Sequence, residues 1–271
     1  MTHESIVRFS TLLSRAATAL KLRCADAVDR ARGRHDPLVP PRRLQFVGAG
    51  DFVATGDEFL AHLTELAGLT PASDVLDVGC GIGRIARPLE QYLTTGSYAG
   101  FDVDPRGIAW CAERYPTDRF AFTLADLHNA RYNPAGTASA RDYRFAYDDD
   151  RFDVAVMTSV VTHLQAPEAE HYLAEALRVL RPGGRLLGTF FLLDDDSRAA
   201  LRAGRATIPF PTDDEEAEMA VADPDLPEEA VAFDERWVRE RLDVRSIDQG
   251  TWRGMPSPPA RSYQDIVVAC A

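Results

Sequence analysis

The sequence is poor in lysine and cysteine and has no long apolar run. Lysine occurs once, at Lys21, against 29 arginines. Because this bias runs through the whole chain, it indicates a GC-rich, bacterial coding sequence and not a targeting peptide. The four cysteines form no CxxC or Cys/His pair with metal-ligand spacing, and a chain of 271 residues does not need disulfides to fold. No run of roughly 18 apolar residues occurs, so we expect no membrane span. The cysteine pattern favours a reducing, cytoplasmic location.

Positive charge is also scarce. The formal net charge is −12, from 42 acidic and 30 basic residues. A surface of that sign repels phosphate backbones, so we do not expect nucleic acid as a partner. The charge is unevenly spread, because residues 1–45 hold nine bases and four acids whereas residues 213–229 hold nine acids and no base.

A hydrophobic content of 45% and a charged content of 27% are ordinary for a folded protein. Apolar residues spaced by three and four predict an amphipathic helix over residues 4–31, ended by Gly33 and Pro37. The helix is either a lid over a cofactor or substrate, or an arm packed on the main domain or on a second subunit of a homodimer. We therefore expect a helical extension in residues 1–45 and one domain over residues 46–271.

From residue 74 onward, strand-like segments alternate with helix-like segments, which predicts a parallel sheet covered on both faces. The expected strands are 74–79, 97–102, 120–124, 152–157 and 184–191. The expected helices are 57–68, 83–93, 105–115 and 167–180. Two further strands, 243–250 and 263–270, have no helix between them and predict an antiparallel hairpin at the sheet edge. The fold class is therefore α/β, a doubly wound sheet with an acidic insertion at about 194–242.

A glycine-rich turn, DVGCGIG, follows the first expected strand at residues 77–83. Glycine has no Cβ, so such a turn lets backbone N–H groups approach a ligand. The frame of Gly81, Gly83 and Ala86 fits the GxGxxA pattern of dinucleotide-binding folds, so a nicotinamide-dependent oxidoreductase is one interpretation. Asp77, just before the turn, favours another, because a carboxylate there repels a pyrophosphate and attracts an α-amino group.

Residues 55–271 resemble the class I S-adenosylmethionine-dependent methyltransferases in five motifs. In chain order these are DVLDVGCGIG, YAGFD, TLADL, FDVAVMTSV and LRVLRPGGRLL. The resemblance implies a Rossmann-like, doubly wound sheet of seven strands with the C-terminal hairpin and the N-terminal helical extension, and it implies S-adenosylmethionine as the cofactor. It assigns cofactor binding to Asp77, Gly79, Cys80, Gly81, Gly83, Asp102, Val103, Asp126, Leu127 and Ser159.

The same resemblance gives these residues roles. The glycine turn would wrap the methionine part of the cofactor, with Asp77 near its amino group. Asp102 would bind both ribose hydroxyls, a task suited to a carboxylate because it accepts through two oxygens. Asp126 and its neighbour would meet the adenine amino group, and Val103 would flank the ring. Asp104, two residues beyond Asp102, is expected to face solvent.

The residues after the fourth expected strand lack the motifs of several related enzymes, and this narrows the class of methyltransferase. Residues 157–160 read Met-Thr-Ser-Val and lack the Asn/Asp-Pro-Pro-aromatic motif of enzymes that methylate nucleobase amino groups. They also lack the acids used by magnesium-dependent catechol-type enzymes and by aminopropyl transferases, so no metal is expected. The acidic runs 148–150 and 194–196 are interpreted as solvated loop charges.

His163 lies four residues beyond Ser159, where the chain crosses the mouth of the expected cofactor site. A histidine, with an ordinary pKa of roughly 6.5, can take the proton of an alcohol acceptor, so His163 is the candidate catalytic base. The alternative is that it only hydrogen-bonds the loop or the cofactor. Residues 127–144 form a long connection whose polar side chains either floor an acceptor pocket or cover the sheet edge. These side chains are His128, Tyr132, Arg141, Tyr143 and Arg144.

The sequence as a whole predicts an enzyme that transfers a methyl group to a small polar acceptor, a hydroxyl of a sugar or secondary metabolite. Methylation of nitrogen or carbon is the nearest alternative. A nicotinamide-dependent oxidoreductase and a cofactor-binding module without turnover are more distant ones.

Overall fold

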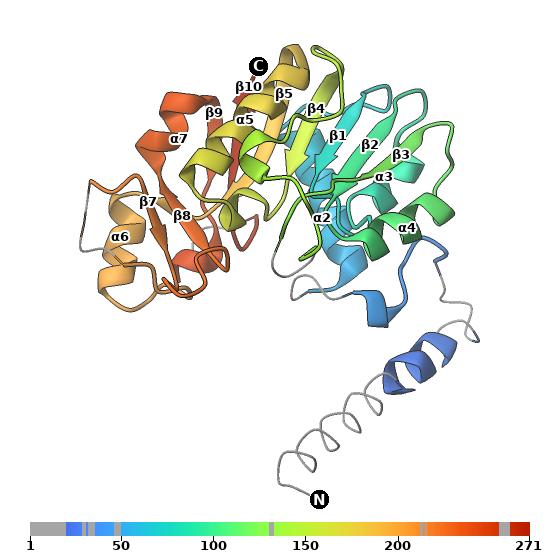
Figure 1. Ribbon diagram of the computed structural model, residues 1–271, viewed down its shortest axis with the longest axis horizontal. Coiled ribbons are helices and arrows are strands. Elements are labelled where there is room, and N and C mark those ends of the chain that lie inside the picture. Colours follow the sequence, from blue (N-terminus) through green and yellow to red (C-terminus); the bar gives the residue numbers. More distant parts are fainter. Residues whose placement is uncertain are drawn as a thin grey trace, which may run out of the picture.

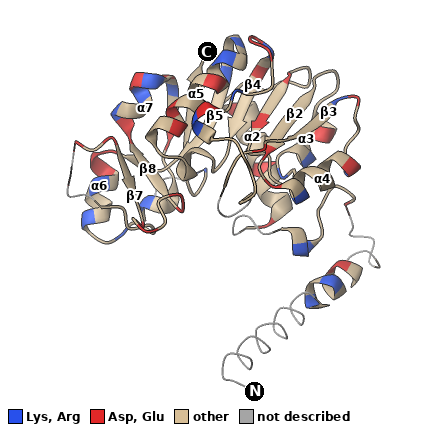
Figure 2. Ribbon diagram, in the orientation of Figure 1, with Lys and Arg blue, Asp and Glu red and all other residues tan. Residues whose placement is uncertain are grey.

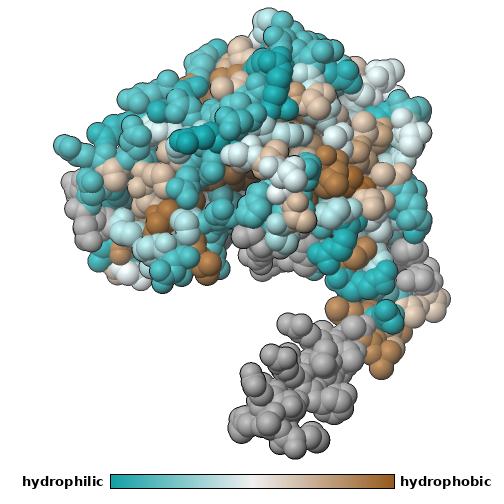
Figure 3. Space-filling model, viewed as in Figure 1, coloured by the Kyte–Doolittle hydropathy of each residue, from teal (hydrophilic) through white to brown (hydrophobic). Residues whose placement is uncertain are grey.

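The computed structural model describes residues 20–28, 31, 36–45, 50–129, 133–211, 214, 216–254 and 261–271. Most of the helix expected over residues 4–31 lies outside these ranges, as does Tyr132. Residues 20–28 are helical, and the helix extends away from the main body (Figure 1). Leu20 and Val28 on this helix are 62% and 45% exposed. The apolar surface at this end of the molecule is visible in Figure 3.

Seven strands form the main sheet, in the order β3-β2-β1-β4-β5-β10-β9. The first five run parallel to their neighbours, whereas β10 runs antiparallel to both β5 and β9. The predicted doubly wound sheet and C-terminal hairpin are therefore confirmed. The strands are β1 (Val75–Val78), β2 (Tyr98–Asp102), β3 (Phe120–Leu124), β4 (Phe152–Met157), β5 (Leu180–Phe190), β9 (Asp243–Asp248) and β10 (Asp265–Cys270).

Helices cover both faces of the sheet (Figure 1). Side chains alternate along β1, so that Val75 joins a core under α2, α3 and α4 while Leu76 and Val78 join a core under α5 and α7. Charged side chains lie mostly on helices and loops, and the central strands carry few of them (Figure 2). The helices are α2 (Phe52–Glu65), α3 (Ala86–Tyr92), α4 (Pro105–Arg114), α5 (Ala166–Val179) and α7 (Glu235–Arg241).

The helix expected at 57–68 begins five residues earlier, at Phe52. The Asp51 side chain accepts hydrogen bonds from the backbone N–H groups of Val53 and Ala54, which makes it the N-cap. Gly56, a residue that weakens helices, lies inside α2 because a Cβ there would collide with the Arg84 carbonyl oxygen. The start of α2 is thereby packed against the chain that follows the glycine turn.

The insertion at 194–242 folds into a small second layer. The chain passes from β5 into β6 (Leu192–Leu193), which pairs with β8 (Val231–Asp234), and β8 pairs with β7 (Met219–Val221). This sheet packs on an apolar cluster of its own, made of Phe191, Leu193, Phe210, Ala230, Ala232 and Trp252. The surface is indented between the insertion and the main sheet (Figure 3).

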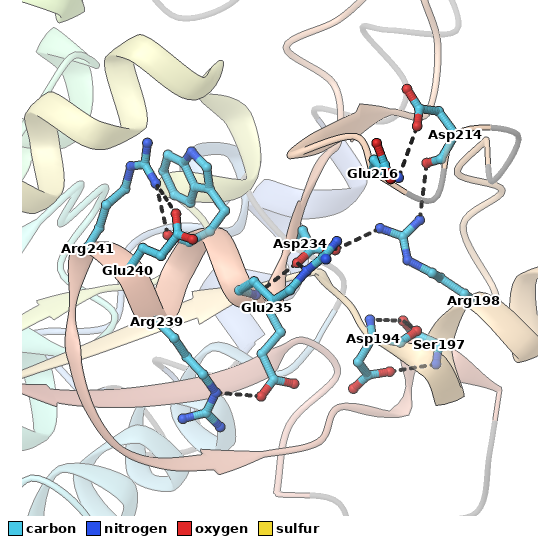
Figure 4. Close-up of polar contacts among 12 residues, drawn as sticks. Asp194, Ser197, Arg198, Asp214, Glu216, Asp234, Glu235, Arg239, Glu240 and Arg241 are labelled. Atoms are coloured by element: carbon cyan, nitrogen blue, oxygen red, sulfur yellow. Dashed lines mark hydrogen bonds and ion pairs between the residues drawn. The ribbon is translucent and has the colours of Figure 1, made fainter.

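Buried ion pairs hold the insertion together (Figure 4). Arg198, on α6 (Asp195–Arg202), places Nη2 2.9 Å from Asp234 Oδ2, and both side chains are buried. Asp194 caps α6 and also pairs with Arg253, Nη1 lying 2.7 Å from Oδ1. The interpretation of Asp194 as a solvated loop charge is therefore wrong, because its carboxylate joins the insertion to the segment before β10.

Candidate cofactor and acceptor site

The carboxyl ends of β1, β2, β4 and β5 meet at one edge of the main sheet. Val78 lies beside Phe101 of β2 on one side and Met157 of β4 on the other, and Met157 lies beside Gly188 of β5. The chain leaves β1 between β2 and β4, the point where the strand order reverses and where open α/β sheets bind ligands. The register therefore brings the glycine turn, Asp102 and residues 158–163 to the same edge.

The glycine turn has a backbone that few other residues could adopt. Gly79, Gly81 and Gly83 have φ angles of 75°, 55° and 82°, in the left-handed region. A Cβ at Gly79 would collide with the Val160 side chain, so the loop after β4 lies directly against the turn. A Cβ at Gly81 would meet nothing within 4 Å, so this face of the turn is open. The Cys80 side chain is buried, which leaves its backbone to contact a ligand.

Asp77 is 1% exposed, and its Oδ2 accepts a hydrogen bond of 2.7 Å from the Tyr98 hydroxyl. Its Oδ1 is also buried and has no partner among the described residues. Burial raises the pKa of Asp77 to about 7, and the negative charge of Asp102 adds to the shift. An unsatisfied buried carboxylate oxygen at the entrance of a glycine turn fits the α-ammonium group of the methionine part of S-adenosylmethionine.

Asp102 ends β2 and ties it to the glycine turn. Its Oδ2 accepts from the Gly81 N–H at 2.7 Å, and its Oδ1 accepts from the Asp104 N–H at 2.8 Å. Burial raises the pKa of Asp102. A carboxylate has about four lone-pair positions, so these two bonds leave room for the two ribose hydroxyls.

The expectation that Asp104 faces solvent is wrong. It is 4% exposed and caps α4, accepting from the backbone N–H groups of Gly107 at 3.1 Å and Arg106 at 3.3 Å. Pro105 occupies the first helical position. An aspartate directly before a proline that opens a helix is a recognisable N-cap pattern, and this signal was available in the sequence.

The residues assigned to the adenine differ in exposure. Asp126 is exposed, and its Oδ2 accepts from the Thr137 hydroxyl at 2.7 Å. Leu127 is 2% exposed and contributes its side chain to the core, as Val103 does in part. Asp126 thus presents a carboxylate to a ligand, whereas Leu127 has only its backbone to offer.

His163 ends a short 3-10 helix, η3 (Val161–His163), in the loop that lies on the glycine turn. Its Nδ1 is 2.8 Å from the backbone carbonyl oxygen of Glu228, which belongs to the insertion. A carbonyl oxygen can only accept, so Nδ1 carries the proton and Nε2 of the neutral ring keeps its lone pair. The insertion therefore holds His163 in the tautomer that a base acting through Nε2 needs.

The long connection 127–144 packs on the α5 face of the sheet. The Tyr143 ring lies 5.8 Å from the Phe101 ring, and the Tyr143 carbonyl oxygen is 2.9 Å from His171 Nε2. His128 and Arg141 are exposed, and Arg144 is exposed beside Asp149 at 3.5 Å. These contacts favour the interpretation in which the connection covers the sheet.

Two residues of this edge, Thr189 and Gln264, were not predicted from the sequence. Ser159 adopts a left-handed φ of 55°, and its N–H donates to Thr189 Oγ1 at 2.8 Å. The Ser159 hydroxyl donates to Gln264 Oε1 at 3.0 Å. A threonine near the end of an apolar strand and a glutamine before another are weak signals by themselves.

Residues 76–188, which contain the glycine turn, Asp102, Asp126 and His163, match the family model described as a methyltransferase domain. This part of the chain is a class I S-adenosylmethionine-dependent methyltransferase domain. S-adenosylmethionine is the cofactor of such domains, and the open glycine turn and the unsatisfied Asp77 oxygen fit it.

Curated relatives of the methyltransferase domain match over part of their length. The chain is 34% identical over 112 residues to phthiotriol/phenolphthiotriol dimycocerosates methyltransferase of Mycobacterium leprae, covering 41% of this chain and 35% of that protein. It is 33% identical over 130 residues to fatty-acid O-methyltransferase of Mycolicibacterium smegmatis, covering 48% of this chain and 41% of that protein. The chain thus spans well under half the length of either relative.

The methyltransferase fold extends over almost the whole chain. Burkholderia thailandensis 1,6-didemethyltoxoflavin-N1-methyltransferase, solved with bound S-adenosylhomocysteine, is similar with a TM-score of 0.51 at 18% identity, covering 94% of this chain and 89% of that one. Within the ranges that the structure describes, no helix has the length and apolar character needed to cross a bilayer. The same ranges contain no cluster of three or more histidine, cysteine or acidic residues arranged to hold a metal.

Proposed function

We propose that the chain transfers the methyl group of S-adenosylmethionine to a hydroxyl oxygen of a small polar acceptor, such as a sugar or a secondary metabolite. The observation that carries the proposal is the placement of His163. Its loop lies on the glycine turn through Val160, and its Nδ1 is held by the Glu228 carbonyl so that Nε2 is free to accept a proton.

The bound cofactor supplies a methyl carbon on a positively charged sulfur, and both electrons of the breaking bond stay on that sulfur. The glycine turn, Asp77 and Asp102 fix the cofactor, and alignment of the reacting groups is worth up to about 7–11 kcal/mol. His163 Nε2 takes the proton of the acceptor hydroxyl as the hydroxyl oxygen forms the new bond to the methyl carbon. Such a base contributes about 10²- to 10⁴-fold to the rate.

Support for oxygen as the acceptor atom comes from two sides. One relative of the domain is a fatty-acid O-methyltransferase, which methylates oxygen by its name. A neutral histidine is matched to an acceptor that must lose a proton on transfer, as an alcohol must. The acidic character of residues 213–229 also disfavours phosphate-rich partners, so we propose a small molecule as the substrate.

For residues 1–45 we propose a lid over the cofactor edge, in a chain located in the cytoplasm. Asp36 and Asp57 both pair with Arg87 of α3, at 2.8 Å and 2.7 Å, and Asp26 pairs with Arg42 at 3.0 Å. Asp36 is thereby held beside the helix that follows the glycine turn, whereas the helix of residues 20–28 extends away from the main body. An arm on a second copy of the chain is the alternative.

The proposed function is tested by incubating the protein with S-adenosylmethionine and a panel of sugars, phenols, fatty acids and amines, and measuring S-adenosylhomocysteine release. We expect release with hydroxyl compounds and a product that carries the methyl group on oxygen. Methylation confined to amines or carbon acids would replace the oxygen assignment. Calorimetric binding of NADH without S-adenosylmethionine would indicate an oxidoreductase, and cofactor binding without release for any acceptor would indicate a binding module.

A further inference from the structure

Four polar side chains from distant parts of the chain form one cluster at the carboxyl edge of the sheet. Ser159 follows β4, Thr162 lies in η3, Thr189 lies near the end of β5, and Gln264 directly precedes β10. Gln264 Oε1 is 2.6 Å from Thr189 Oγ1 and 3.0 Å from Ser159 Oγ. The methyltransferase mechanism described above does not use this cluster.

The hydrogen bonds fix the orientation of the Gln264 amide. Thr189 is 1% exposed, and its Oγ1 already accepts the Ser159 N–H at 2.8 Å. Within the described ranges, Gln264 Oε1 is the acceptor found for the Thr189 hydroxyl hydrogen, at 2.6 Å. If the amide were turned around, that buried hydrogen would lose its acceptor, which is unfavourable. The amide oxygen therefore faces Thr189 and Ser159, and the amide nitrogen faces away.

The amide nitrogen has hydrogen-bonding capacity left over. Nε2 carries two hydrogens, and its contact to Thr162 Oγ1 is long, at 3.4 Å. Gln264 is half-buried and Ser159 is exposed, so the cluster reaches the surface at this edge. Buried partners thus fix the amide, and among the described residues the second hydrogen of Nε2 has no partner.

The backbone that carries Gln264 is held rigidly. The next residue, Asp265, is fully buried and accepts four hydrogen bonds of 2.8 to 2.9 Å. The donors are Leu192 N, Gly250 N, Trp252 Nε1 and Arg253 Nε. On the other side of the cluster, Ser159 has a left-handed φ of 55°, a conformation that is uncommon for non-glycine residues and recurs at functional sites.

We propose that Gln264 is the acceptor-orienting residue of the methyltransferase site, whose Nε2–H donates a hydrogen bond to an oxygen of the acceptor beside the oxygen that is methylated. The inference rests on the proposed function for the identity of the reaction. It adds that the acceptor carries a second oxygen, as a diol, a hydroxy-carbonyl compound or a carboxylic acid does. Thr189 and Ser159 are positioning residues that act through the amide.

The test compares Gln264→Glu with the parent. Glutamate keeps an oxygen that accepts from Thr189 and Ser159 but has no N–H to donate, so the fold is preserved and the proposed contact is lost. Gln91→Glu, an exposed position on α3, makes the same chemical change elsewhere and is the matched control. Gln264→Met removes both the amide oxygen and the amide nitrogen. Its Tm measures how much the cluster contributes to the stability of the fold.

Acceptor binding is measured by calorimetry on protein loaded with S-adenosylhomocysteine, with a panel of sugars, catechols and hydroxy acids, so the readout does not depend on turnover. For Gln264→Glu we expect acceptor Kd to rise about 10-fold or more, while cofactor Kd and Tm stay close to those of the parent. Gln91→Glu should match the parent throughout. Steady-state kinetics should show the same loss in kcat/KM for the acceptor.

Unchanged acceptor binding and kcat/KM in Gln264→Glu would overturn the inference, as would a parent protein that binds none of the oxygen-bearing compounds. A Tm loss in Gln264→Met with unchanged acceptor affinity in both variants would leave the cluster as a structural tie between β4 and β10. A parent that binds these compounds without methylating them contradicts the proposed function, and the binding comparison then still decides the role of Gln264.

Discussion

Tyr98 donates its hydroxyl hydrogen to Asp77 Oδ2 across 2.7 Å, on the face of the sheet covered by α2, α3 and α4. Burial raises the pKa of Asp77 from 3.8 to about 7. Between these values the folded protein holds a proton that the unfolded chain has released. Folding is therefore favoured by this group at acid pH, and that contribution is lost as the pH rises from about 4 to about 7, by about 4 kcal/mol in all.

The first prediction concerns Asp77→Asn in the cofactor-free protein. Asparagine carries no charge, so the variant should gain stability relative to the parent as the pH rises. Melting temperatures at about pH 5 and about pH 8 measure the difference. The cofactor affinity of the parent should rise over the same range, because a carboxylate binds the ammonium group better than a carboxylic acid does. A pH-independent gap between the two proteins would contradict the assigned pKa.

The second prediction concerns Asp102→Ala. Loss of charge-assisted hydrogen bonds to two ribose hydroxyls should weaken S-adenosylmethionine binding about 10- to 100-fold, equivalent to roughly 1.5–3 kcal/mol. Calorimetry gives the affinity. Asp104 cannot be the control because it caps α4, so the exposed Asp118 is used as Asp118→Ala, which should bind as the parent does. Parental affinity in Asp102→Ala would exclude the ribose assignment.

The third prediction concerns His163→Ala. If His163 is the base for an oxygen acceptor, kcat should fall about 10²- to 10⁴-fold with little change in cofactor affinity. The decline of parental kcat at acid pH should be absent from the variant, because a base must be unprotonated to act. Retention of more than about a third of parental kcat would leave alignment as the whole of the catalysis.

The fourth prediction concerns the joint between the insertion and the main sheet. Arg253 is 2% exposed and bonds to both Asp194 and Asp265, so Arg253→Met leaves the half-buried carboxylate of Asp194 and the buried carboxylate of Asp265 without their cation. The cost should be about 3–5 kcal/mol. Arg239→Met is the matched control: Arg239 is half-exposed and pairs with Glu235 one helical turn away, so its loss should cost under about 0.5 kcal/mol. Denaturant unfolding measures both, and equal costs would contradict the prediction.

The fifth prediction concerns the N-terminal extension. A chain without residues 1–33 keeps the pairs of Asp36 and Asp57 with Arg87 and should remain folded. A lid predicts weaker cofactor binding or slower turnover in the truncated chain, and slower proteolysis of the parent when cofactor is added. A truncated chain that is fully active but has lost a dimer, seen by light scattering, would identify an arm.

The main sheet could be predicted from the sequence because its strands are apolar runs bounded by turn residues. Segments such as VLDV and FDVAVM are buried on both faces, and this burial dictates their composition. The start of α2 could not be predicted in the same way. Gly56 is a helix breaker on propensity alone, and only its contact with Arg84 in the folded chain explains its presence.

The fold of the insertion and the polar cluster around Gln264 could not be predicted from the sequence, for different reasons. β7 and β8 have three and four residues, too few to establish a period. The hydrogen bond between Ser159 and Gln264 joins residues 105 positions apart. A serine or a glutamine in a sequence gives no indication of a partner so distant along the chain. The carboxylates Asp77 and Asp102 were found because they belong to motifs, whereas their partners Tyr98 and Gly81 became evident only in three dimensions.

The chain passes from β5 of the main sheet into β6 of the insertion's own sheet across a single residue, Phe191. A module joined in this way has no hinge of its own at that point, and its outer loops can change in length without disturbing the strand that carries it. The loop between β7 and β8 is the exception, because it contains Glu228, whose carbonyl oxygen lies 2.8 Å from His163 Nδ1. A change in the length of that loop would therefore alter the orientation of His163 while the glycine turn keeps its shape.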